Sequence, residues 1–273
     1  MDQSRWDRKG TERLREIEAD PEKFIVRDCP VKGLSVRADL LRLLGPLEGR
    51  DVLELGCGRG ELAVFLARQS AHVSAVDVGE DLVSAAAHLA RVNGVHCDFQ
   101  QASIVDLPLP AERFDLVVGL SVLHHLSPSD VERAVREVHR VLRPTGAAVF
   151  REPVENSRVF DLLQNLVPRG RKGSRDYRPS LIQRRAWRDW RAGVDDRTMT
   201  YGELRSVGAR YFCSVDLCPQ GLFCRLERVI GRRHRNRLDA VDRFLLAWAP
   251  FLKRFSQTAL VRYREKRSLP HDA

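Results

Sequence analysis

The sequence lacks the features that mark membrane-spanning and secreted proteins. No uninterrupted apolar stretch reaches the length of about 18 residues that a membrane-spanning helix needs. The charged N-terminus has no apolar segment of the kind found in secretory signal peptides. Among the 6 cysteines, no two form a C-x-x-C pair, so no metal site is predicted. We therefore expect a cytoplasmic protein with reduced thiols.

Negative charge is scarce in the second part of the chain. Residues 1–150 carry a net charge of −4 and residues 151–273 a net charge of +13, which together make the overall +9. With 43% hydrophobic and 30% charged residues, the composition is typical of a soluble globular protein. The basic part is compatible with a solvated surface, an anionic substrate, a nucleic acid or an anionic membrane, and composition leaves these alternatives open.

Short apolar runs alternate with helical patterns over the first part of the chain. This alternation predicts βαβ units, and therefore a mostly parallel sheet with helices on both faces. Ligands of such sheets bind beyond the carboxyl ends of the strands, so the residues after each run are candidates for a site. The expected strands cover residues 52–55, 72–78, 95–101, 114–120 and 147–151, and the expected helices cover residues 60–69, 80–93 and 128–142.

Residues 153–200 interrupt this alternation, because they contain several prolines and glycines and a cluster of arginines and lysines at 169–191. We predict a basic cap there, followed by two further strands near 208–217 and 257–265. The expected organisation is a helical segment at 1–48 that covers the site, a core at 49–153, a cap at 154–205 and a part at 206–273 that completes the sheet.

A helix is expected at 236–254, between the last two strands, because apolar residues recur on one side of it. The simplest interpretation is that this side packs on the sheet. The basic run at 231–237 before the helix supports an alternative, in which the region contacts an anionic membrane peripherally. The apolar residues on that side are Leu238, Val241, Phe244, Leu245 and Trp248.

A glycine-rich turn follows the first expected strand, with Gly56, Gly58 and Gly60 in the segment VLELGCGRG. Glycines permit a tight turn and a close approach of the backbone to a ligand, and the next helix directs free N–H groups at the loop. A dinucleotide-binding fingerprint would have glycine or alanine where Glu61 stands, and a phosphate-binding Walker loop would need G-K-S/T. A cationic ligand without phosphate suits this turn better.

Two carboxylates accompany the turn. Glu54 lies two residues before the first glycine, and Asp77 ends the second expected strand. A carboxylate at that strand end can accept hydrogen bonds from both ribose hydroxyls of a nucleoside. Asp77 alone would be as well explained as a helix cap, but its combination with the glycine turn favours the ribose.

The chain resembles the class I S-adenosylmethionine-dependent methyltransferases in four segments that occur in the family's order: VLELGCGRG, VSAVDVGEDLV, IVDLPLPAERFDLVVGLSVLHHL and VHRVLRPTGAAVFREP. The resemblance implies an α/β, Rossmann-like, seven-stranded mixed sheet, mostly parallel with an antiparallel last strand. It also implies S-adenosyl-L-methionine as cofactor, with its methionine end at the glycine turn. The implied cofactor-binding residues are Glu54, Gly56, Cys57, Gly58, Gly60, Asp77, Val78, Ser103, Ile104 and Leu120.

The expected adenine contact departs from the family pattern. Members usually carry an aspartate or a similar residue after the third strand, whereas the matching position here is Ser103. A serine oxygen can accept from the adenine amine as a neutral partner, and Asp106 is the neighbouring alternative.

Candidate groups for chemistry follow the fourth and fifth expected strands. Methyl transfer mainly requires alignment of the acceptor with the methyl group, and a general base only where the acceptor must lose a proton. His124 and His125 follow the fourth strand, and Glu152 ends the fifth. A histidine can accept a proton near neutral pH. Packing of the histidines, and an ion pair of Glu152 with an arginine, are the structural alternatives.

We predict a methyltransferase that transfers a methyl group to an O, N or C atom of a small-molecule acceptor. Arginines of the cap would suit an anionic acceptor. An RNA or protein methyltransferase that uses residues 169–191 is the first alternative, and a non-catalytic cofactor-binding protein is the second. Nucleic acid ranks behind a small molecule, because no separate RNA-binding motif occurs.

Overall fold

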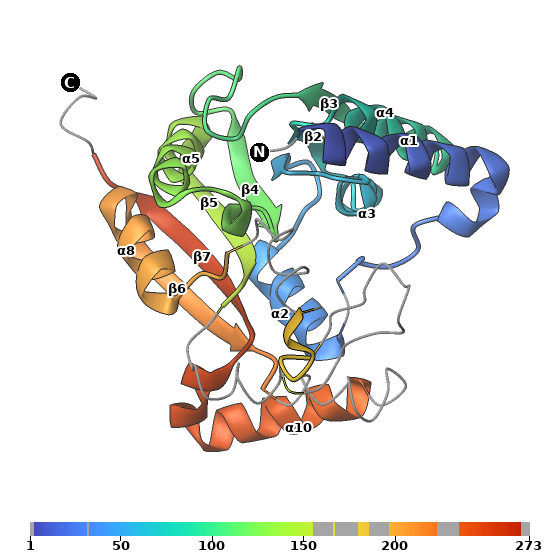
Figure 1. Ribbon diagram of the computed structural model, residues 1–273. Helices are drawn as coiled ribbons and strands as arrows, with labels where there is room; N and C mark the ends of the chain where they lie inside the picture. The colour runs from blue at the N-terminus through green and yellow to red at the C-terminus, as the bar shows by residue number, and fades with distance from the viewer. Residues whose placement is uncertain are drawn as a thin grey trace.

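The computed structural model describes residues 3–31, 33–154, 166, 180–185, 197–222 and 235–268. They form a seven-stranded sheet in the order β3-β2-β1-β4-β5-β7-β6 (Figure 1). The first five strands pair in parallel, and β7 pairs antiparallel with both β5 and β6. The predicted fold class is thereby confirmed. The strands are β1 (Asp51–Leu55), β2 (His72–Asp77), β3 (Asp98–Gln101), β4 (Phe114–Leu120), β5 (Leu142–Pro153), β6 (Phe212–Gln220) and β7 (Thr258–Lys266).

Helices cover both faces of the sheet. One apolar cluster joins the strands to α5 and α8, and a second joins them to α2, α3 and α4. α1 packs on the outer side of α4, and α10 lies at the bottom of Figure 1, away from α1. The helices are α1 (Gln3–Ala19), α2 (Leu34–Leu44), α3 (Glu61–Arg68), α4 (Glu80–Val92), α5 (Pro128–Val141), α8 (Tyr201–Tyr211) and α10 (Arg235–Trp248), with shorter 3-10 helices η1 (Pro21–Phe24), η2 (Leu123–His125) and η5 (Pro250–Phe255).

The core helix α5 illustrates how the sequence specifies these elements. Ser127 precedes it and its hydroxyl accepts from the backbone N–H of Asp130 at 3.2 Å, while Pro128 occupies the first turn. Val131, Val135 and Val138, together with Ala134, form its buried stripe. The cap and the apolar spacing therefore specify both the start of the helix and the side that meets the sheet.

The structure corrects the strand predicted at 208–217. Residues up to Tyr211 belong to helix α8, and β6 begins at Phe212. The helix begins at Tyr201, and Thr200 caps it, because its hydroxyl accepts from the backbone N–H of Glu203 at 3.1 Å. The Thr-x-x-Glu pattern of a capping box was the signal in the sequence. α8 also runs across residue 205, where the cap was expected to end.

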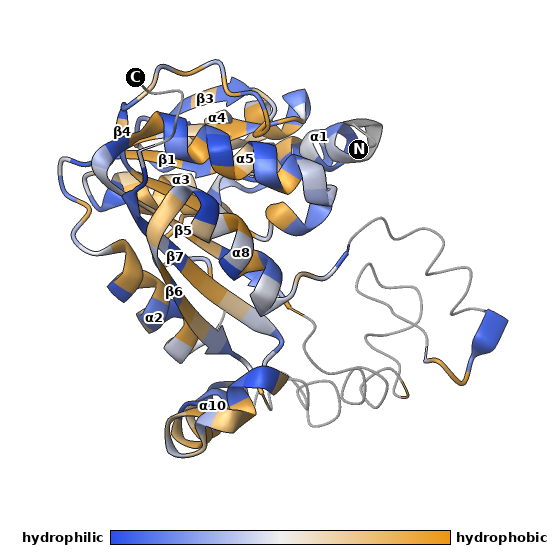
Figure 2. Cartoon of the chain, turned by 90° about the vertical axis from the view of Figure 1, so that its left-hand side faces the viewer, coloured by the Kyte–Doolittle hydropathy of each residue, from blue (hydrophilic) through white to orange (hydrophobic). Residues whose placement is uncertain are grey.

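The structure also corrects the orientation predicted for the helix at 236–254. α10 ends at Trp248, and Val241, Phe244 and Trp248 are exposed instead of packing on the sheet. Asp239 and Asp242 are the buried residues, each with 2% of its surface exposed. Figure 2 shows apolar residues on α10, which lies below α2 in that view. Within the described ranges, no helix has the length and apolar character needed to cross a bilayer.

Candidate functional site

The glycine turn connects β1 to α3 with all three glycines at positive φ, 65° at Gly56, 50° at Gly58 and 80° at Gly60. A Cβ atom on Gly56 would lie 2.6 Å from Val122, and one on Gly60 would lie 2.7 Å from Ala86. A Cβ on Gly58 would meet no described atom within 4 Å. The outer glycines therefore allow close packing, whereas the middle one faces open space.

Asp77 joins the turns that follow β1 and β2. One of its carboxylate oxygens accepts from the backbone N–H of Gly58 at 2.8 Å, and the other accepts from that of Gly79 at 3.0 Å. A carboxylate has about four acceptor positions, so each oxygen retains capacity for a ligand hydroxyl. The side chain is buried, which restricts such a ligand to the space beside the turn.

Glu54 carries a buried carboxylate oxygen that lacks a hydrogen-bond partner within the part of the chain that the structure describes. Its side chain is on β1 and only 3% of the residue is exposed. Burial raises the pKa of Glu54 well above its ordinary value, and the nearby negative charges of Glu61 and Asp77 raise it further. A backbone hydrogen bond at Ala63 lowers the pKa in part, and the other oxygen of this buried carboxylate stays without a partner among the described residues. One unpaired carboxylate oxygen at a turn with open space suits a cationic ligand.

Cys57 lies between the first two glycines and is buried. Its backbone N–H donates to the carbonyl of Val76 at 3.0 Å, which ties the turn to β2. Burial raises the pKa of the Cys57 thiol well above its ordinary value, so the thiol stays protonated. Any contact of Cys57 with a ligand is therefore expected through its backbone.

Both candidates for the adenine contact lie in the turn after β3. The backbone N–H of Asp106 donates to the carbonyl of Ser103 at 3.2 Å, and both residues are exposed. Ile104 between them is buried. The turn adjoins Asp77, whose carbonyl accepts from the N–H of Ala102 at 2.9 Å. The geometry brings both candidates to the Asp77 side of the site.

Two apolar candidates complete the expected cofactor-binding set. Val78 directly follows Asp77 and is half-buried, and its carbonyl accepts from the side chain of Gln101 at 3.0 Å. Leu120 ends β4, is half-buried and packs against the second apolar cluster. Both therefore lie at the carboxyl edge of the sheet, as the strand pattern predicted.

Glu152 near the end of β5 is fully buried and binds backbone N–H groups at the start of η2. Its carboxylate accepts from the backbone N–H of Val122 at 3.0 Å and from that of Leu123 at 2.9 Å. The same carboxylate lies 2.9 Å from Nδ1 of His124, which is also buried. This arrangement orients η2 and His124.

His125 occupies the more accessible position of the two histidines. Its ring packs on that of His124 with centroids 4.0 Å apart, and it meets the ring of Trp6 edge-on at 5.3 Å. Of the three predicted groups for chemistry, His125 alone is half-buried rather than buried. These three assignments remain predictions.

α1 crosses the turns that follow β1, β2 and β4, and it contributes residues that sequence reasoning did not single out. Arg13 forms an ion pair with Glu61 at 2.6 Å, and Thr11 hydrogen-bonds the carboxylate of Asp81. A Cβ on Gly10 would lie 2.2 Å from the backbone of Asp81, so α1 and α4 touch backbone to backbone. A glycine inside a predicted helix was the available signal, because it often marks close packing.

Most of the predicted basic cap, including most of the arginines at 169–191, lies outside the described residues. Arg197, which belongs to the described part of this predicted cap, contacts η2 and the residue after it. The backbone N–H of Arg197 donates to the carbonyl of His124 at 3.3 Å, and its Nε donates to the carbonyl of Leu126 at 2.7 Å. The segment before α8 is thus anchored beside the histidines.

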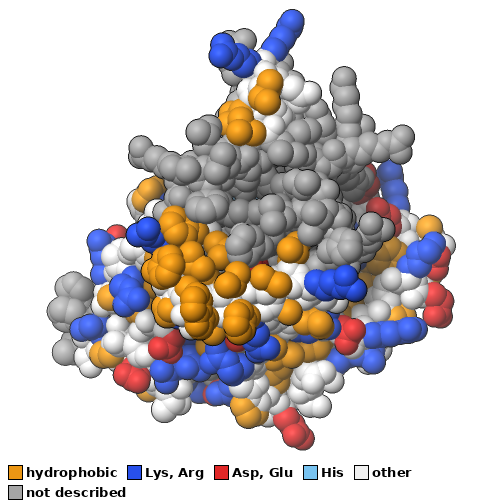
Figure 3. All heavy atoms as spheres, turned by 90° about the horizontal axis from the view of Figure 1, so that it is seen from below, with side chains coloured by type: hydrophobic (Ala, Val, Ile, Leu, Met, Phe, Trp, Pro, Cys, Tyr) orange, Lys and Arg blue, Asp and Glu red, His pale blue; other side chains and the backbone are white. Residues whose placement is uncertain are grey.

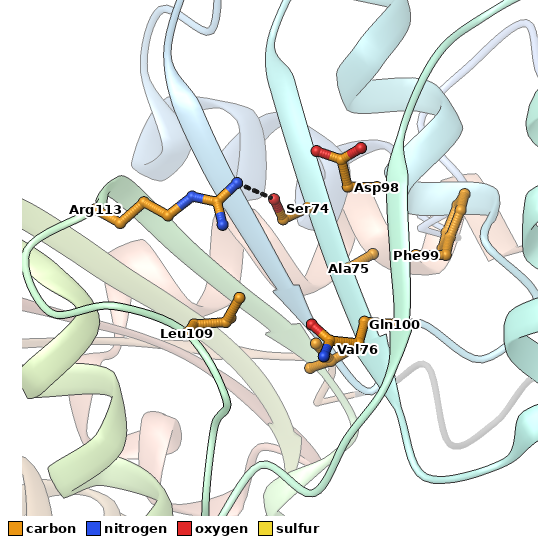
Figure 4. A pocket seen from close by; sticks show the side chains of 8 residues that line it. All are labelled: Ser74, Ala75, Val76, Asp98, Phe99, Gln100, Leu109 and Arg113. Atoms are coloured by element: carbon orange, nitrogen blue, oxygen red, sulfur yellow. Dashed lines mark hydrogen bonds between the residues drawn. The ribbon is translucent and has the colours of Figure 1, made fainter.

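A separate pocket of about 310 Å³ lies on the face of β2 and β3, and none of the predicted site residues lines it (Figure 4). In it, Arg113 donates to the hydroxyl of Ser74 at 3.2 Å. Its lining runs along both strands, from Ser74 to Val76 of β2 and from Asp98 to Gln100 of β3, and does not include the turns that follow them. This pocket is therefore distinct from the site at the carboxyl edge.

Comparison with known proteins identifies the family to which the chain belongs. A family model described as a methyltransferase domain matches residues 52–146. A ubiquinone biosynthesis O-methyltransferase from Pseudomonas syringae is 33% identical over 58% of this chain and 71% of its own length. The chain belongs to the class I S-adenosylmethionine-dependent methyltransferases. The predicted family and its cofactor, S-adenosylmethionine, are thereby confirmed.

Other relatives match a smaller part of their own length. A ubiquinone biosynthesis O-methyltransferase from Coxiella burnetii is 30% identical over 50% of this chain and 61% of its own length. The chain thus spans about 61% of the length of such relatives.

Solved structures agree on the fold. An S-adenosylmethionine-dependent methyltransferase from Mesorhizobium loti has a TM-score of 0.54 and 24% identity over 83% of this chain and 96% of its own. Magnesium protoporphyrin IX methyltransferase from Synechocystis, solved with bound SAH, has a TM-score of 0.55 and 15% identity over 97% of this chain and 98% of its own. A [4+2]-cyclase shares the fold with a TM-score of 0.54 and 20% identity, over 95% of this chain and 93% of its own. The fold by itself therefore does not specify methyl transfer.

The residues of the site fit the family's cofactor. The sulfonium and ammonium charges of S-adenosylmethionine suit the unpaired carboxylate oxygen of Glu54. The open side of Gly58 leaves room beside the turn, and Asp77 retains acceptor capacity for hydroxyls.

Proposed function

We propose that this protein is a cytoplasmic methyltransferase that transfers a methyl group from S-adenosylmethionine to an O, N or C atom of a small-molecule acceptor. The observation that carries the proposal is the buried, unpaired oxygen of Glu54 beside a glycine turn with open space. When bound, the cofactor supplies a methyl group on an electron-deficient sulfur. Of the three acceptor atoms O, N and C, oxygen is supported by the relatives that are named as O-methyltransferases.

In this proposal the chain's own residues bind and orient. Glu54 neutralises positive charge at the methionine end, while Gly56, Gly58 and Gly60 admit that end to the backbone. Asp77 accepts from the ribose hydroxyls, and Ser103 or Asp106 accepts from the adenine amine. α1 closes the site from outside through its contacts with the turns.

An oxygen acceptor that carries a proton requires a base, and we assign this role to His125. It is half-buried at the carboxyl edge, where a neutral imidazole can take a proton near neutral pH. Glu152 is a positioning residue in this scheme, because its carboxylate holds His124 and the backbone of η2. The ring of His124 in turn packs on His125.

The ribose assignment predicts that Asp77→Ala weakens cofactor binding by more than about 1 kcal/mol, because a buried charged hydrogen-bond acceptor is lost. Isothermal titration calorimetry with S-adenosylmethionine measures this. Asp98→Ala is the matched control, since it removes an exposed aspartate at the other pocket. Unchanged affinity in a folded Asp77→Ala protein would overturn the assignment.

The base assignment predicts that His125→Ala lowers kcat by about 10²-fold or more at unchanged cofactor affinity. Labelled-methyl transfer is measured against a panel of small hydroxyl and amine compounds, total RNA and total protein. Glu152→Gln is expected to shift the pH profile of kcat, which loss of a purely structural contact would not do. Label appearing only in RNA or protein would contradict a small-molecule acceptor, and full turnover of His125→Ala would remove it as base.

A further inference from the structure

The lower face of the molecule carries a group of exposed apolar side chains on α10 and η5, which we call the α10–η5 face. Val241, Phe244, Trp248 and Phe251 are 47%, 68%, 77% and 66% exposed. The first three are spaced by three and four residues and so share one side of the helix. Figure 3 views this side of the molecule and shows apolar side chains gathered in one area, with Lys and Arg side chains and some Asp and Glu side chains along its lower edge. Exposed aromatic residues in such a group are typical of a contact surface.

All exposed charge on residues 236–255 is positive. Arg237, Arg243, Lys253 and Arg254 are exposed, whereas the two acidic residues of this segment, Asp239 and Asp242, are buried. The exposed residues of the face are therefore large apolar side chains and positively charged side chains, with no exposed acidic side chain among residues 236–255. That composition complements a surface that is apolar beneath an anionic layer.

Contacts on the opposite side of α10 hold the face outward. The carboxylate of Asp239 accepts from the backbone N–H of Ser35 at 2.5 Å and also from its hydroxyl, at the N-terminus of α2. Leu246 and Ala249 are buried on this inner side. Turning the apolar side inward would break the contact with α2 and bury basic residues, so the exposure is part of the packing.

The face lies at the same edge of the sheet as the site. η5 leads into β7 at Thr258, and Thr258 pairs with both Pro153 of β5 and Gln220 of β6. Pro153 directly follows Glu152, which supports η2. A surface bound by the α10–η5 face would therefore lie near the end of β5, close to Glu152 of the site.

We propose that the α10–η5 face binds the surface of an anionic lipid bilayer, with Phe244, Trp248 and Phe251 among the headgroups and acyl-chain ends and the basic residues on lipid phosphates. The charge decides against a second copy of the chain, because a two-fold contact would bring these cations against one another. The proposal does not depend on methyl transfer, and it is tested without an activity assay.

The test is flotation of the full chain with vesicles of phosphatidylcholine alone and of phosphatidylcholine mixed with phosphatidylglycerol. Binding to the mixed vesicles is expected to be more than about tenfold tighter and to fall with salt. The double variant Phe244→Ser/Trp248→Ser should lose more than about tenfold in partitioning. Ile182→Ser, which removes an apolar residue that is 74% exposed elsewhere, should retain it.

Charge is tested by a matched pair. Arg243→Gln should weaken binding to the mixed vesicles on the order of fivefold, because one cation near an anionic surface is lost. Arg68→Gln removes an exposed arginine at the end of α3 and should bind as the parent protein does. Equal losses in the two variants would indicate an effect of net charge and overturn the assignment to this face.

Contact is tested with lipids brominated on their acyl chains, which quench the fluorescence of a nearby tryptophan. Trp248→Phe keeps the face apolar, so it should still float with vesicles while most of the quenching disappears. Three results would each overturn the proposal. They are absence of binding to mixed vesicles, quenching that survives in Trp248→Phe, and parent-like flotation of the double variant. So would a concentration-dependent dimer that forms only when Phe244 and Trp248 are present. Parent-like thermal unfolding and cofactor affinity of the double variant confirm that it is folded.

Discussion

The glycine-turn region under α1 and the junction of α2 with α10 share two features but differ in how a buried carboxylate is paired. In each, an outlying helix docks on the N-terminal turn of another helix, α1 on α4 at Gly10 and α10 on α2 through Asp239. In each, a carboxylate is buried. Asp239 is satisfied by the N-terminus of α2, whereas Glu54 retains an oxygen that no described residue pairs.

This difference distinguishes a structural carboxylate from one that a ligand completes. Both Asp239 and Glu54 are almost fully buried, so burial does not separate them. Their hydrogen bonds separate them, because both oxygens of Asp239 have partners and one oxygen of Glu54 has none among the described residues. A buried carboxylate that is only partly paired destabilises the unliganded protein until a cation neutralises it. Substitutions in the two regions are therefore expected to differ in the sign of their effect on stability.

The largest effect is expected for Gly10→Ala. The added methyl group would lie 2.2 Å from the backbone carbonyl carbon of Asp81, so α1 must move away from α4. We expect a loss of about 3 kcal/mol in the free energy of unfolding, measured by urea denaturation, and weaker cofactor binding. Gly202→Ala in α8 is the control, since the nearest atom to its added Cβ would be the hydroxyl oxygen of Thr200 at 3.8 Å. That change should be neutral or stabilising by up to about 1 kcal/mol. A stable Gly10→Ala protein would contradict the close docking.

A smaller loss is expected for Asp239→Ala, about 2 kcal/mol, because the N-terminus of α2 and the hydroxyl of Ser35 lose their acceptor. Urea denaturation measures the change. Asp239→Asn retains one acceptor oxygen and should lose less. If alanine and asparagine behave alike, the hydrogen bonds at Ser35 do not hold α10.

The smallest effect, of opposite sign, is expected for Glu54→Gln. Because burial raises the pKa of Glu54, the folded state resists its ionisation while the unfolded state does not. The native glutamate therefore lowers stability progressively as the pH rises above the ordinary glutamate value toward the raised one. Without cofactor, the glutamine variant should be more stable by about 1 kcal/mol near neutral pH and equal to the parent at acidic pH.

The same Glu54→Gln change should weaken binding of the cationic cofactor, which isothermal titration calorimetry measures. Thermal unfolding over a pH series gives the stability part. A destabilised glutamine variant, or one with parent-like cofactor affinity, would show that Glu54 is a structural carboxylate like Asp239.

The sequence by itself determined the layered α/β fold, the glycine turn, the family and the identity of Glu54 and Asp77 as its acidic companions. These follow from local patterns: strand and helix periods, positive-φ glycines and the residues at strand ends. Helix α8 was also within reach, since Thr200 and Glu203 form a capping box.

Only the tertiary structure decided how the outlying helices face. The pattern of α10 shows one apolar and one polar side, and the hydrophobic effect alone would turn the apolar side inward. Asp239 reverses this by binding Ser35, 204 residues earlier in the chain. The docking of α1 through Gly10 and the support of His124 by Glu152 likewise join distant segments. Such contacts depend on which helix terminus or backbone arrives opposite a given side chain, and no local pattern encodes that.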